Sequence, residues 1–245
     1  MKELFQNVME NAVFVAEFLL IIAGLFVAAV LVEKLANKKY GVQEKLFTTR
    51  KVAMIGMFSA IAMILMLFEL PLPFAPPFYK LDLSELPVLV GGFAFGPAAG
   101  VMIEFAKILL KLFVKPTSTA FVGELANFAV GCSFVLPASI VYLFWKRKKG
   151  AITGCIVGTL VLTLFGSMFN AVYLLPAFSE LYGMPLETIL GMGSAVNPLM
   201  TEGSMISFVI CCVVPINLIK GTVVSVLTML IYKPLSPIIK SSHQK

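Results

Sequence analysis

Lys220 is the residue of this sequence whose position most clearly calls for a chemical explanation. It lies near the middle of a long apolar run, Met205 to Tyr232, which has the length and composition of a membrane helix. A lysine at bilayer depth costs about 2.5–3.5 kcal/mol on insertion scales, so its side chain should face protein or a cavity. Asn217 precedes it by three residues, which places both polar side chains on one helical face. An ammonium and an amide on one face can bind a ligand through hydrogen bonds.

Pro215 and Gly221 flank these two residues and alter the helix around them. Because proline has no N–H, Pro215 releases the carbonyl of Cys211 from its helical hydrogen bond. Gly221 lets another backbone or a ligand approach closely. The segment Pro215–Gly221 therefore predicts a polar pocket built into a membrane helix. A structural alternative stays open, in which the amide and the ammonium satisfy a carbonyl of a neighbouring helix.

The composition indicates an integral membrane protein. Of its 245 residues, 59% are hydrophobic and 13% are charged, whereas soluble domains carry about 25% charged residues. Several long apolar runs make the protein polytopic. The four cysteines lie in apolar runs without a Cys-x-x-Cys spacing, and the one histidine, His243, lies in the tail. We therefore expect buried cysteines and no metal site.

The sequence contains no motif for catalysis or for ATP hydrolysis. It lacks the phosphate-binding loop, the zinc motif His-Glu-x-x-His and the nucleophile motif Gly-x-Ser-x-Gly. We predict that the protein is not an enzyme and has no cofactor. The net charge of +6 does not indicate nucleic-acid binding, because of where the basic residues lie. If the protein takes up a ligand actively, the energy must come from a partner or from an ion gradient.

The apolar runs predict an all-α, polytopic membrane bundle. Residues 1–33 hold an apolar span, 12–32, which we interpret as an uncleaved transmembrane helix rather than a signal peptide. Residues 34–51 are predicted to be a basic cytoplasmic linker, 52–235 a six-helix membrane domain and 236–245 a cytoplasmic tail. The six helices of the domain are predicted over residues 52–68, 86–95, 101–114, 120–145, 151–176 and 205–232.

The segments around the two short helices carry most of the remaining signals. Residues 69–82 contain four prolines and three aromatic residues, which forbid a regular helix and predict an ordered, apolar lid. Ser84 is expected to cap the next helix, with Asp82 and Glu85 favouring its N-terminus. The glycines and proline of residues 96–100 predict a tight turn.

Two further segments contain charged residues whose roles differ. Glu104, Lys107 and Lys111 follow one another at helical spacing, and we interpret Glu104 and Lys107 as a helix-surface ion pair. Residues 177–203 contain three glutamates and no lysine or arginine, and are expected to form a loop.

The basic residues predict the orientation in the membrane. Of the nineteen, six lie in residues 33–51, four in 146–149 and three after the last span, at Lys233, Lys240 and Lys245. If the spans alternate, all three places fall on one side, which the positive-inside rule assigns to the cytoplasm. The lid and the 177–203 segment then lie outside, so the pocket is predicted to open outward from a cell membrane.

Three separated motifs, in order along the chain, are similar to those of a known family. They are Asp82–Gly100, Thr119–Asn127 and Pro215–Gly221. The sequence resembles the riboflavin-binding S-components, the substrate-capture subunits, of energy-coupling factor (ECF) transporters, over roughly residues 45–235. The resemblance implies a six-helix membrane protein that captures riboflavin from outside. The 12–32 helix is additional to that pattern.

The same resemblance implies partners and roles. The protein would work in the lipid bilayer with a transmembrane coupling subunit and two cytoplasmic ATPases. Asn170, Asn217 and Lys220 match residues that hydrogen-bond the flavin, and the proline-rich lid helps to cover it. The family's Ala-x-x-x-Ala contact with the coupling subunit corresponds here to Gly56 and Ala60, a change that keeps the small surface.

Three further residues complete the predicted ligand-binding set. Glu124 and Asn127 either brace the mouth of the site or touch the ligand. For Asp82, support of the helix N-terminus ranks above ligand contact.

The chemistry of riboflavin suits the predicted pocket, although alternatives stay open. Riboflavin is a transported ligand rather than a cofactor, and its neutral, flat ring has an imide edge that an asparagine amide can match. The absence of arginine from the predicted site disfavours a phosphorylated flavin. One alternative is an S-component for another vitamin, since Lys220 alone does not exclude a carboxylate. The other is an ion-coupled secondary transporter that uses Glu104 and Lys220 as a relay.

Overall fold

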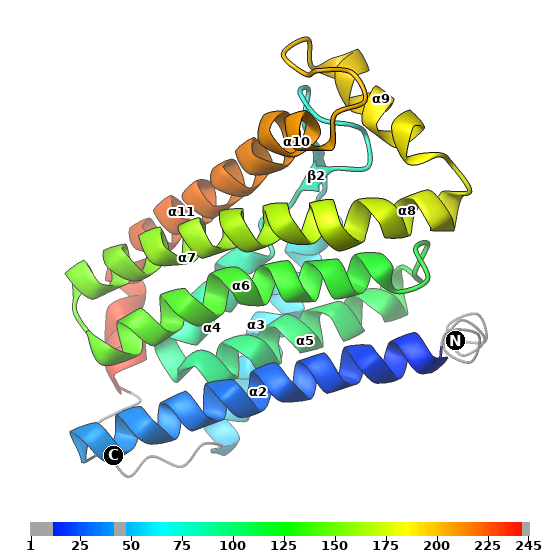
Figure 1. Cartoon of the computed structure of the whole chain (residues 1–245). Helices are drawn as coiled ribbons and strands as arrows, with labels where there is room; N and C mark the ends of the chain where they lie inside the picture. Colours follow the sequence, from blue (N-terminus) through cyan, green and yellow to red (C-terminus); the bar gives the residue numbers. More distant parts are fainter. Residues whose placement is uncertain (1–11, 42–47, 242–245) are drawn as a thin grey trace.

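Helices form almost the whole of the described chain, as a membrane-embedded backbone requires in order to satisfy its own hydrogen bonds (Figure 1). The computed structural model describes residues 12–41 and 48–241. Its elements, in chain order, are α2 (Ala12–Tyr40), α3 (Thr49–Leu67), β1 (Leu70–Pro71), β2 (Lys80–Leu81), α4 (Glu85–Phe95), α5 (Pro97–Val114), α6 (Val122–Phe144), α7 (Lys148–Phe169), the π-helical turn η1 (Asn170–Leu174), α8 (Leu175–Tyr182), α9 (Leu186–Val196), α10 (Met205–Phe208), the π-helical turn η2 (Val209–Val213) and α11 (Val214–Ser241).

Several of these helices have the length and composition of membrane spans. Five apolar stretches qualify: Ala12–Tyr40, Thr49–Leu67, Val122–Phe144, Lys148–Tyr182 and Met205–Ile231. The short α4 and the charged α5 complete a core of six helices, α3, α4, α5, α6, α7 and α11, with α2 outside it. The predicted all-α polytopic bundle with one additional N-terminal helix is therefore confirmed.

The short helix α4 lies at the centre of the bundle, in contact with α3, α5, α6 and α11. Nearly all of its residues are buried. A Cβ atom on Gly91 would collide with Ile103 of α5, and one on Gly92 would collide with Ser139 of α6. This glycine pair lets three helices pack closely. The tight turn predicted over residues 96–100 is confined to Gly96, which has a φ of 96°, because Pro97 already begins α5.

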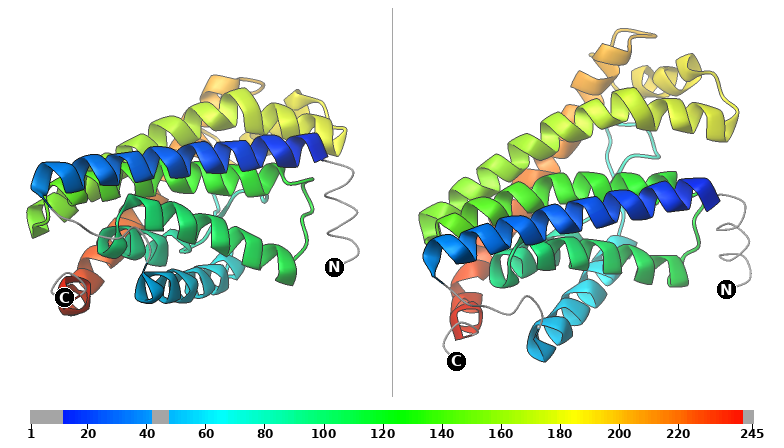
Figure 2. Two further views of the ribbon diagram at one scale, coloured as in Figure 1. Left: turned by 90° about the horizontal axis from the view of Figure 1, so that it is seen from below. Right: turned by 60° about the horizontal axis from the view of Figure 1, so that its bottom comes forward.

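The N-terminal helix α2 packs along α5 and α6 (Figures 1 and 2). Phe18 of α2 meets Phe128 of α6 edge to face, with ring centroids 5.7 Å apart. Near the other end of α2, a Glu33 carboxylate oxygen accepts a hydrogen bond of 2.8 Å from the backbone N–H of Ala98, in the first turn of α5. Lys51 at the start of α3 approaches the same carboxylate at 3.8 Å. α2 is therefore attached to the core along its length.

Three connecting segments differ in form from the expectations. α2 continues through Tyr40, so the first part of the predicted 34–51 linker is helical, while residues 42–47 lie outside the described residues. α11 likewise continues through Ser241, into the predicted tail. The prediction of a loop over 177–203 is wrong, because these residues contain the end of α8 and all of α9. Gly193 serves packing in α9, since a Cβ on this residue would meet the ring of Phe208 at 2.7 Å.

The basic segments gather at one end of the bundle. The C-terminal ends of α2 and α11 lie there together with the turn between α6 and α7 (Figure 1). The Tyr40 hydroxyl donates a hydrogen bond of 2.8 Å to the carbonyl of Phe144, and the Lys39 ammonium lies 5.7 Å from the centre of the Phe144 ring. The β1–β2 hairpin, α8 and α9 lie away from this end (Figure 1).

Candidate functional site

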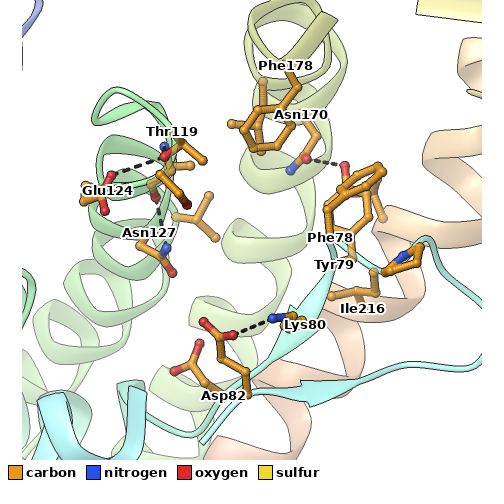
Figure 3. A pocket seen from close by; sticks show the side chains of 18 of the residues that line it. Phe78, Tyr79, Lys80, Asp82, Thr119, Glu124, Asn127, Asn170, Phe178 and Ile216 are labelled. Atoms are coloured by element: carbon orange, nitrogen blue, oxygen red, sulfur yellow. Dashed lines mark hydrogen bonds and ion pairs between the residues drawn. The ribbon is translucent and has the colours of Figure 1, made fainter. Parts of the chain in front are cut away.

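A cavity of about 630 Å³ lies between the β1–β2 hairpin, α6, the α7–α8 region, α9 and α11. It is the size of a small-molecule site. All six residues predicted to bind ligand line it: Asp82, Glu124, Asn127, Asn170, Asn217 and Lys220. Their lining of one cavity is a finding of the structure, whereas their contact with a ligand stays a prediction. Figure 3 shows how the α6 wall faces the lid across this space.

Asn170 is the first residue of the π-helical turn η1. Its side-chain N–H donates a hydrogen bond of 2.7 Å to the carbonyl of Gly166, and its side-chain oxygen accepts one of 2.6 Å from the Tyr79 hydroxyl of the lid (Figure 3). Burial raises the pKa of Tyr79 well above its ordinary value, so the hydroxyl stays protonated and donates. An amide has two N–H groups and two acceptor lone pairs. Asn170 therefore keeps one donor and one acceptor for a ligand.

Asn217 contributes a second amide from α11. It is buried, and its Nδ2 has no hydrogen-bond partner among the residues the structure describes. The amide packs closely on Gly166 of α7, since a Cβ on that glycine would meet Nδ2 at 2.7 Å. A buried donor without a partner is costly. Asn217 is therefore positioned to gain most from a ligand acceptor.

Lys220 is held by two carboxylates. Its Nζ lies 3.3 Å from Oδ2 of Asp82 and 2.9 Å from Oε2 of Glu85. Burial alone would raise the pKa of Asp82, but the nearby ammonium groups of Lys220 and Lys107 and hydrogen bonds from Ser84 outweigh it and lower that pKa to about 2. Asp82 and Glu85 therefore pair with lysines and also lie at the N-terminus of α4 as expected, where Oδ1 of Asp82 accepts a hydrogen bond of 2.8 Å from the backbone N–H of Ser84.

The interpretation of Glu104 and Lys107 as a surface ion pair is wrong. The two side chains do pair, at 2.7 Å, but both are 0% exposed. Lys107 also lies 3.1 Å from Glu85 and donates a hydrogen bond of 2.8 Å to the hydroxyl of Ser84. The reason is that α5 packs against α2, α3, α4 and α6, which leaves this face no access to solvent. Ser84 makes no side-chain cap on α4, so that expectation is also wrong.

Glu124 organises the turn before α6. Its carboxylate lies 2.7 Å from the Lys111 ammonium and accepts hydrogen bonds from the hydroxyls of Thr117 and Thr119, at 2.9 and 3.3 Å. The Asn127 side chain donates to the carbonyl of Gly123 at 2.9 Å, one turn back on α6. These contacts are those of a brace at the mouth of the cavity, and ligand contact by either residue stays a prediction (Figure 3).

Comparison with known proteins identifies the family. The family described as "ECF transporter, substrate-specific component" matches residues 50–232. This chain belongs to that family. Among its relatives, "Riboflavin transporter RibU" of Staphylococcus aureus (strain TCH60) is 36% identical over 191 residues, which cover 78% of this chain and 93% of the relative. "Riboflavin transporter FmnP" of Bacillus subtilis (strain 168) is 29% identical over 195 residues, covering 79% and 96%.

A solved structure supports the same family. It is described as "Structure and mechanism of the S component of a bacterial ECF transporter" and matches with a TM-score of 0.60 and 33% sequence identity, over 78% of this chain and 98% of its own. In this substrate-specific component, α2 lies wholly outside the residues that the family matches. The helix is therefore additional to the shared core.

The predicted partner contact of this S-component lies on an open face of α3. Gly56 is exposed, and a Cβ added to it would meet no heavy atom within 4 Å. Ala60 is half-buried one turn further along. The face is accessible to another protein, and its contact with a coupling subunit stays a prediction.

Sequence reasoning missed one residue that lines this S-component's cavity, Tyr79, and one that joins the lid to η2, Asn197. Tyr79 was included only as part of an aromatic-rich lid, and its bond to Asn170 spans 91 positions. Asn197, after α9, donates hydrogen bonds to the carbonyls of Cys211, at 3.1 Å, and Phe74, at 3.5 Å. The Cys211 carbonyl is the one that Pro215 was predicted to release, so the proline signalled that some donor must lie nearby.

Proposed function

We propose that this protein captures riboflavin from outside the cell and delivers it through an ATP-driven ECF module. The proposal combines the family with the names of the relatives, which are riboflavin transporters. The observation that carries it at the site is the pair of asparagine amides on η1 and α11, which retain unused hydrogen-bonding capacity beside one cavity. Riboflavin supplies a matching edge, because its imide has one donor between two acceptors.

The rest of the cavity wall suits a flat aromatic ring. Aromatic and methionine side chains from the lid, α8 and α9 line it: Phe78, Tyr79, Phe178, Tyr182, Met184 and Met192. Rings of this kind stack on flat ligands, and methionine sulfur packs favourably against aromatic edges. A ligand with a wide apolar face and a polar edge is therefore favoured over a small polar metabolite.

The charges in the cavity favour a neutral ligand. Lys220 already faces two carboxylates. Two of the three lysines nearer the mouth have close glutamate partners: Lys80 lies 2.6 Å from Glu69, and Lys111 pairs with Glu124. No arginine lines the cavity. A vitamin that carries a carboxylate would have to compete with these acidic partners, so riboflavin is preferred to an anionic vitamin.

We also propose the orientation and the partners that the function requires. The basic end of the bundle lies in the cytoplasm, by the positive-inside rule, and the lid and the cavity mouth face outward. The ATPases of the ECF module supply the energy, and a transmembrane coupling subunit meets the Gly56 and Ala60 face of α3. The exposure of that face supports this contact.

Titration of the purified protein with riboflavin tests the ligand. Stoichiometric binding in detergent should quench the intrinsic fluorescence of the flavin. If equimolar riboflavin stays free in both detergent and liposomes, the assignment is wrong. Parallel titrations with thiamine, biotin and pantothenate test an S-component for another vitamin.

Reconstitution in liposomes tests the source of energy. We expect riboflavin uptake only when the ECF module and ATP are supplied. Uptake by this chain alone, driven by a proton or sodium gradient, would instead establish an ion-coupled transporter. Glu104 does not line the cavity, which is a reason to expect no Glu104–Lys220 relay.

A further inference from the structure

The Lys220 ammonium has three N–H groups, and the protein engages two of them. One faces Oδ2 of Asp82 at 3.3 Å and one faces Oε2 of Glu85 at 2.9 Å. One N–H is left for a ligand in the cavity that Lys220 lines. Since a lysine side chain has four flexible methylenes, the direction of that remaining N–H depends on what holds the other two.

The two carboxylates differ in how firmly they are fixed. Asp82 follows β2 and belongs to the end of the lid, and it lines the cavity itself. Glu85 is the first residue of the central helix α4, is almost fully buried and does not line the cavity. Its bond to Lys220 is the shorter of the two. Glu85 is therefore the more firmly fixed of the two carboxylates that hold Lys220.

Lys107, Glu104 and Ser84 fix Glu85 in turn. Its other oxygen, Oε1, lies 3.1 Å from the Lys107 ammonium. Lys107 is held by the Glu104 carboxylate at 2.7 Å and by the Ser84 hydroxyl at 2.8 Å. Gly131 of α6 makes room for Glu104, because a Cβ there would collide with the carboxylate. Each oxygen of Glu85 thus faces one lysine, from α5 on one side and α11 on the other.

We propose that Glu85 is a positioning residue for ligand binding. It holds the Lys220 ammonium so that the free N–H faces the cavity, and Lys107 and Glu104 hold Glu85. This inference rests on the proposed riboflavin-binding function and assigns part of the affinity to a side chain that does not touch the ligand. A lysine held only by the lid residue Asp82 would follow the lid instead of the bundle core.

The test compares riboflavin dissociation constants in a double-mutant cycle. Glu85→Gln keeps the shape of the side chain and removes its charge. We expect it to raise the Kd by about tenfold, the size of effect that follows from weakening one charge-assisted hydrogen bond. In a Lys220→Met background, Glu85→Gln should leave the Kd unchanged, because the residue it positions is gone.

The thermal midpoints of the same variants provide a second measurement of the coupling between Glu85 and Lys220. Three carboxylates and two ammonium groups make up the cluster of Asp82, Glu85, Glu104, Lys107 and Lys220. Lys220→Met leaves two acids without that cation, so its thermal midpoint should fall. Adding Glu85→Gln restores the wild-type charge balance and should recover part of the loss.

A matched control and a second variant complete the experiment. Glu33→Gln removes another buried glutamate charge, far from the cavity lining, and should leave the Kd at the wild-type value. If Glu85→Gln does not fold, Glu85→Asp retains the charge but withdraws it from Lys220, and should raise the Kd less.

The inference is overturned if the folded Glu85 variant binds riboflavin as the wild type does. It is also overturned if Glu85→Gln changes the Kd by the same factor with and without Lys220. Failure of the wild type to bind riboflavin in the same titration would instead refute the proposed function.

Discussion

At the scale of single residues, a substitution of Asn217 should weaken ligand binding without changing stability. Its Nδ2 has no hydrogen-bond partner among the described residues, so truncation removes an unsatisfied group. We expect Asn217→Ala to leave the thermal midpoint of the free protein nearly unchanged. The riboflavin Kd should rise roughly two- to tenfold, the equivalent of one neutral hydrogen bond.

Thermal unfolding and fluorescence titration of the same preparation check this expectation. Asn127→Ala is the comparison, because the Asn127 amide already donates to the Gly123 carbonyl and has less capacity left for a ligand. A variant at Asn217 that loses stability but keeps its affinity would show that the amide is structural.

The polar residues themselves could be found from the sequence, but their partners could not. An amide and an ammonium in a membrane helix are expensive enough to stand out, and the cavity confirms that Asn217 and Lys220 share a face. The spacing of Glu104 and Lys107 is equally compatible with a surface and an interior pair, so it misled us. Which face of α5 is covered depends on helices far away in the chain.

At the scale of elements, Asn197 joins the outer helices to α11. Its amide donates to the Cys211 carbonyl in η2 and to the lid carbonyl of Phe74. Asn197→Ala leaves the Cys211 carbonyl unpaired, which costs about 1–3 kcal/mol. Backbone amides around residues 197–204 should therefore exchange with solvent at least several times faster in the free protein.

Hydrogen exchange measured by mass spectrometry tests this role, with Ser194→Ala as the matched control. The Ser194 hydroxyl donates to the nearby carbonyl of Gly191 within α9, so its loss should leave the exchange of residues 197–204 unchanged. Equal exchange in the two variants would show that Asn197 does not hold the outer helices in place.

α2 provides a second prediction at this scale, in which stability changes and ligand affinity does not. The Glu33 carboxylate accepts a hydrogen bond from the first turn of α5, where a negative charge is stabilising by up to about 2 kcal/mol. Glu33→Gln should therefore lower the thermal midpoint and leave the riboflavin Kd unchanged. Parallel unfolding and titration measurements check both parts, and a changed Kd would connect α2 to the binding site.

Helical periodicity located the spans better than it located the connections. The central helix α4 was recognisable as a short apolar run between a proline-rich segment and a glycine turn. α9 was missed because Gly191 and Gly193 are poor helix formers in isolation. Packing of Gly193 against Phe208 stabilises the helix although its local helix propensity is low, and that contact joins separate elements.

At the scale of the whole molecule, the proposed sites of ligand capture and of partner contact lie on different parts of the protein. The cavity is lined mainly by the lid, α6, η1, α8, α9 and α11, and α3 contributes Met66 near its C-terminal end. Gly56 lies earlier on α3, on an exposed face, and does not line the cavity. A ligand can therefore be bound without that face, and delivery can be blocked without changing affinity. The two functions should separate by mutation.

Gly56→Leu tests this separation. A Cβ at Gly56 would meet no heavy atom within 4 Å, so the isolated protein should tolerate a larger side chain. Riboflavin Kd and thermal midpoint should match the wild type, while ATP-driven uptake in liposomes containing the ECF module should fall at least about tenfold if leucine prevents close helix packing.

Gly24→Leu on α2 is the matched control for that experiment. Gly24 is also exposed in an apolar helix, with no heavy atom within 4 Å of an added Cβ, but it lies outside the residues that the family shares. Uptake should be normal in this variant, because the change adds the same apolar bulk to a face that the shared core does not use. Equal loss of uptake in both variants would attribute the effect to apolar bulk in general, and normal uptake in both would remove Gly56 from the coupling surface.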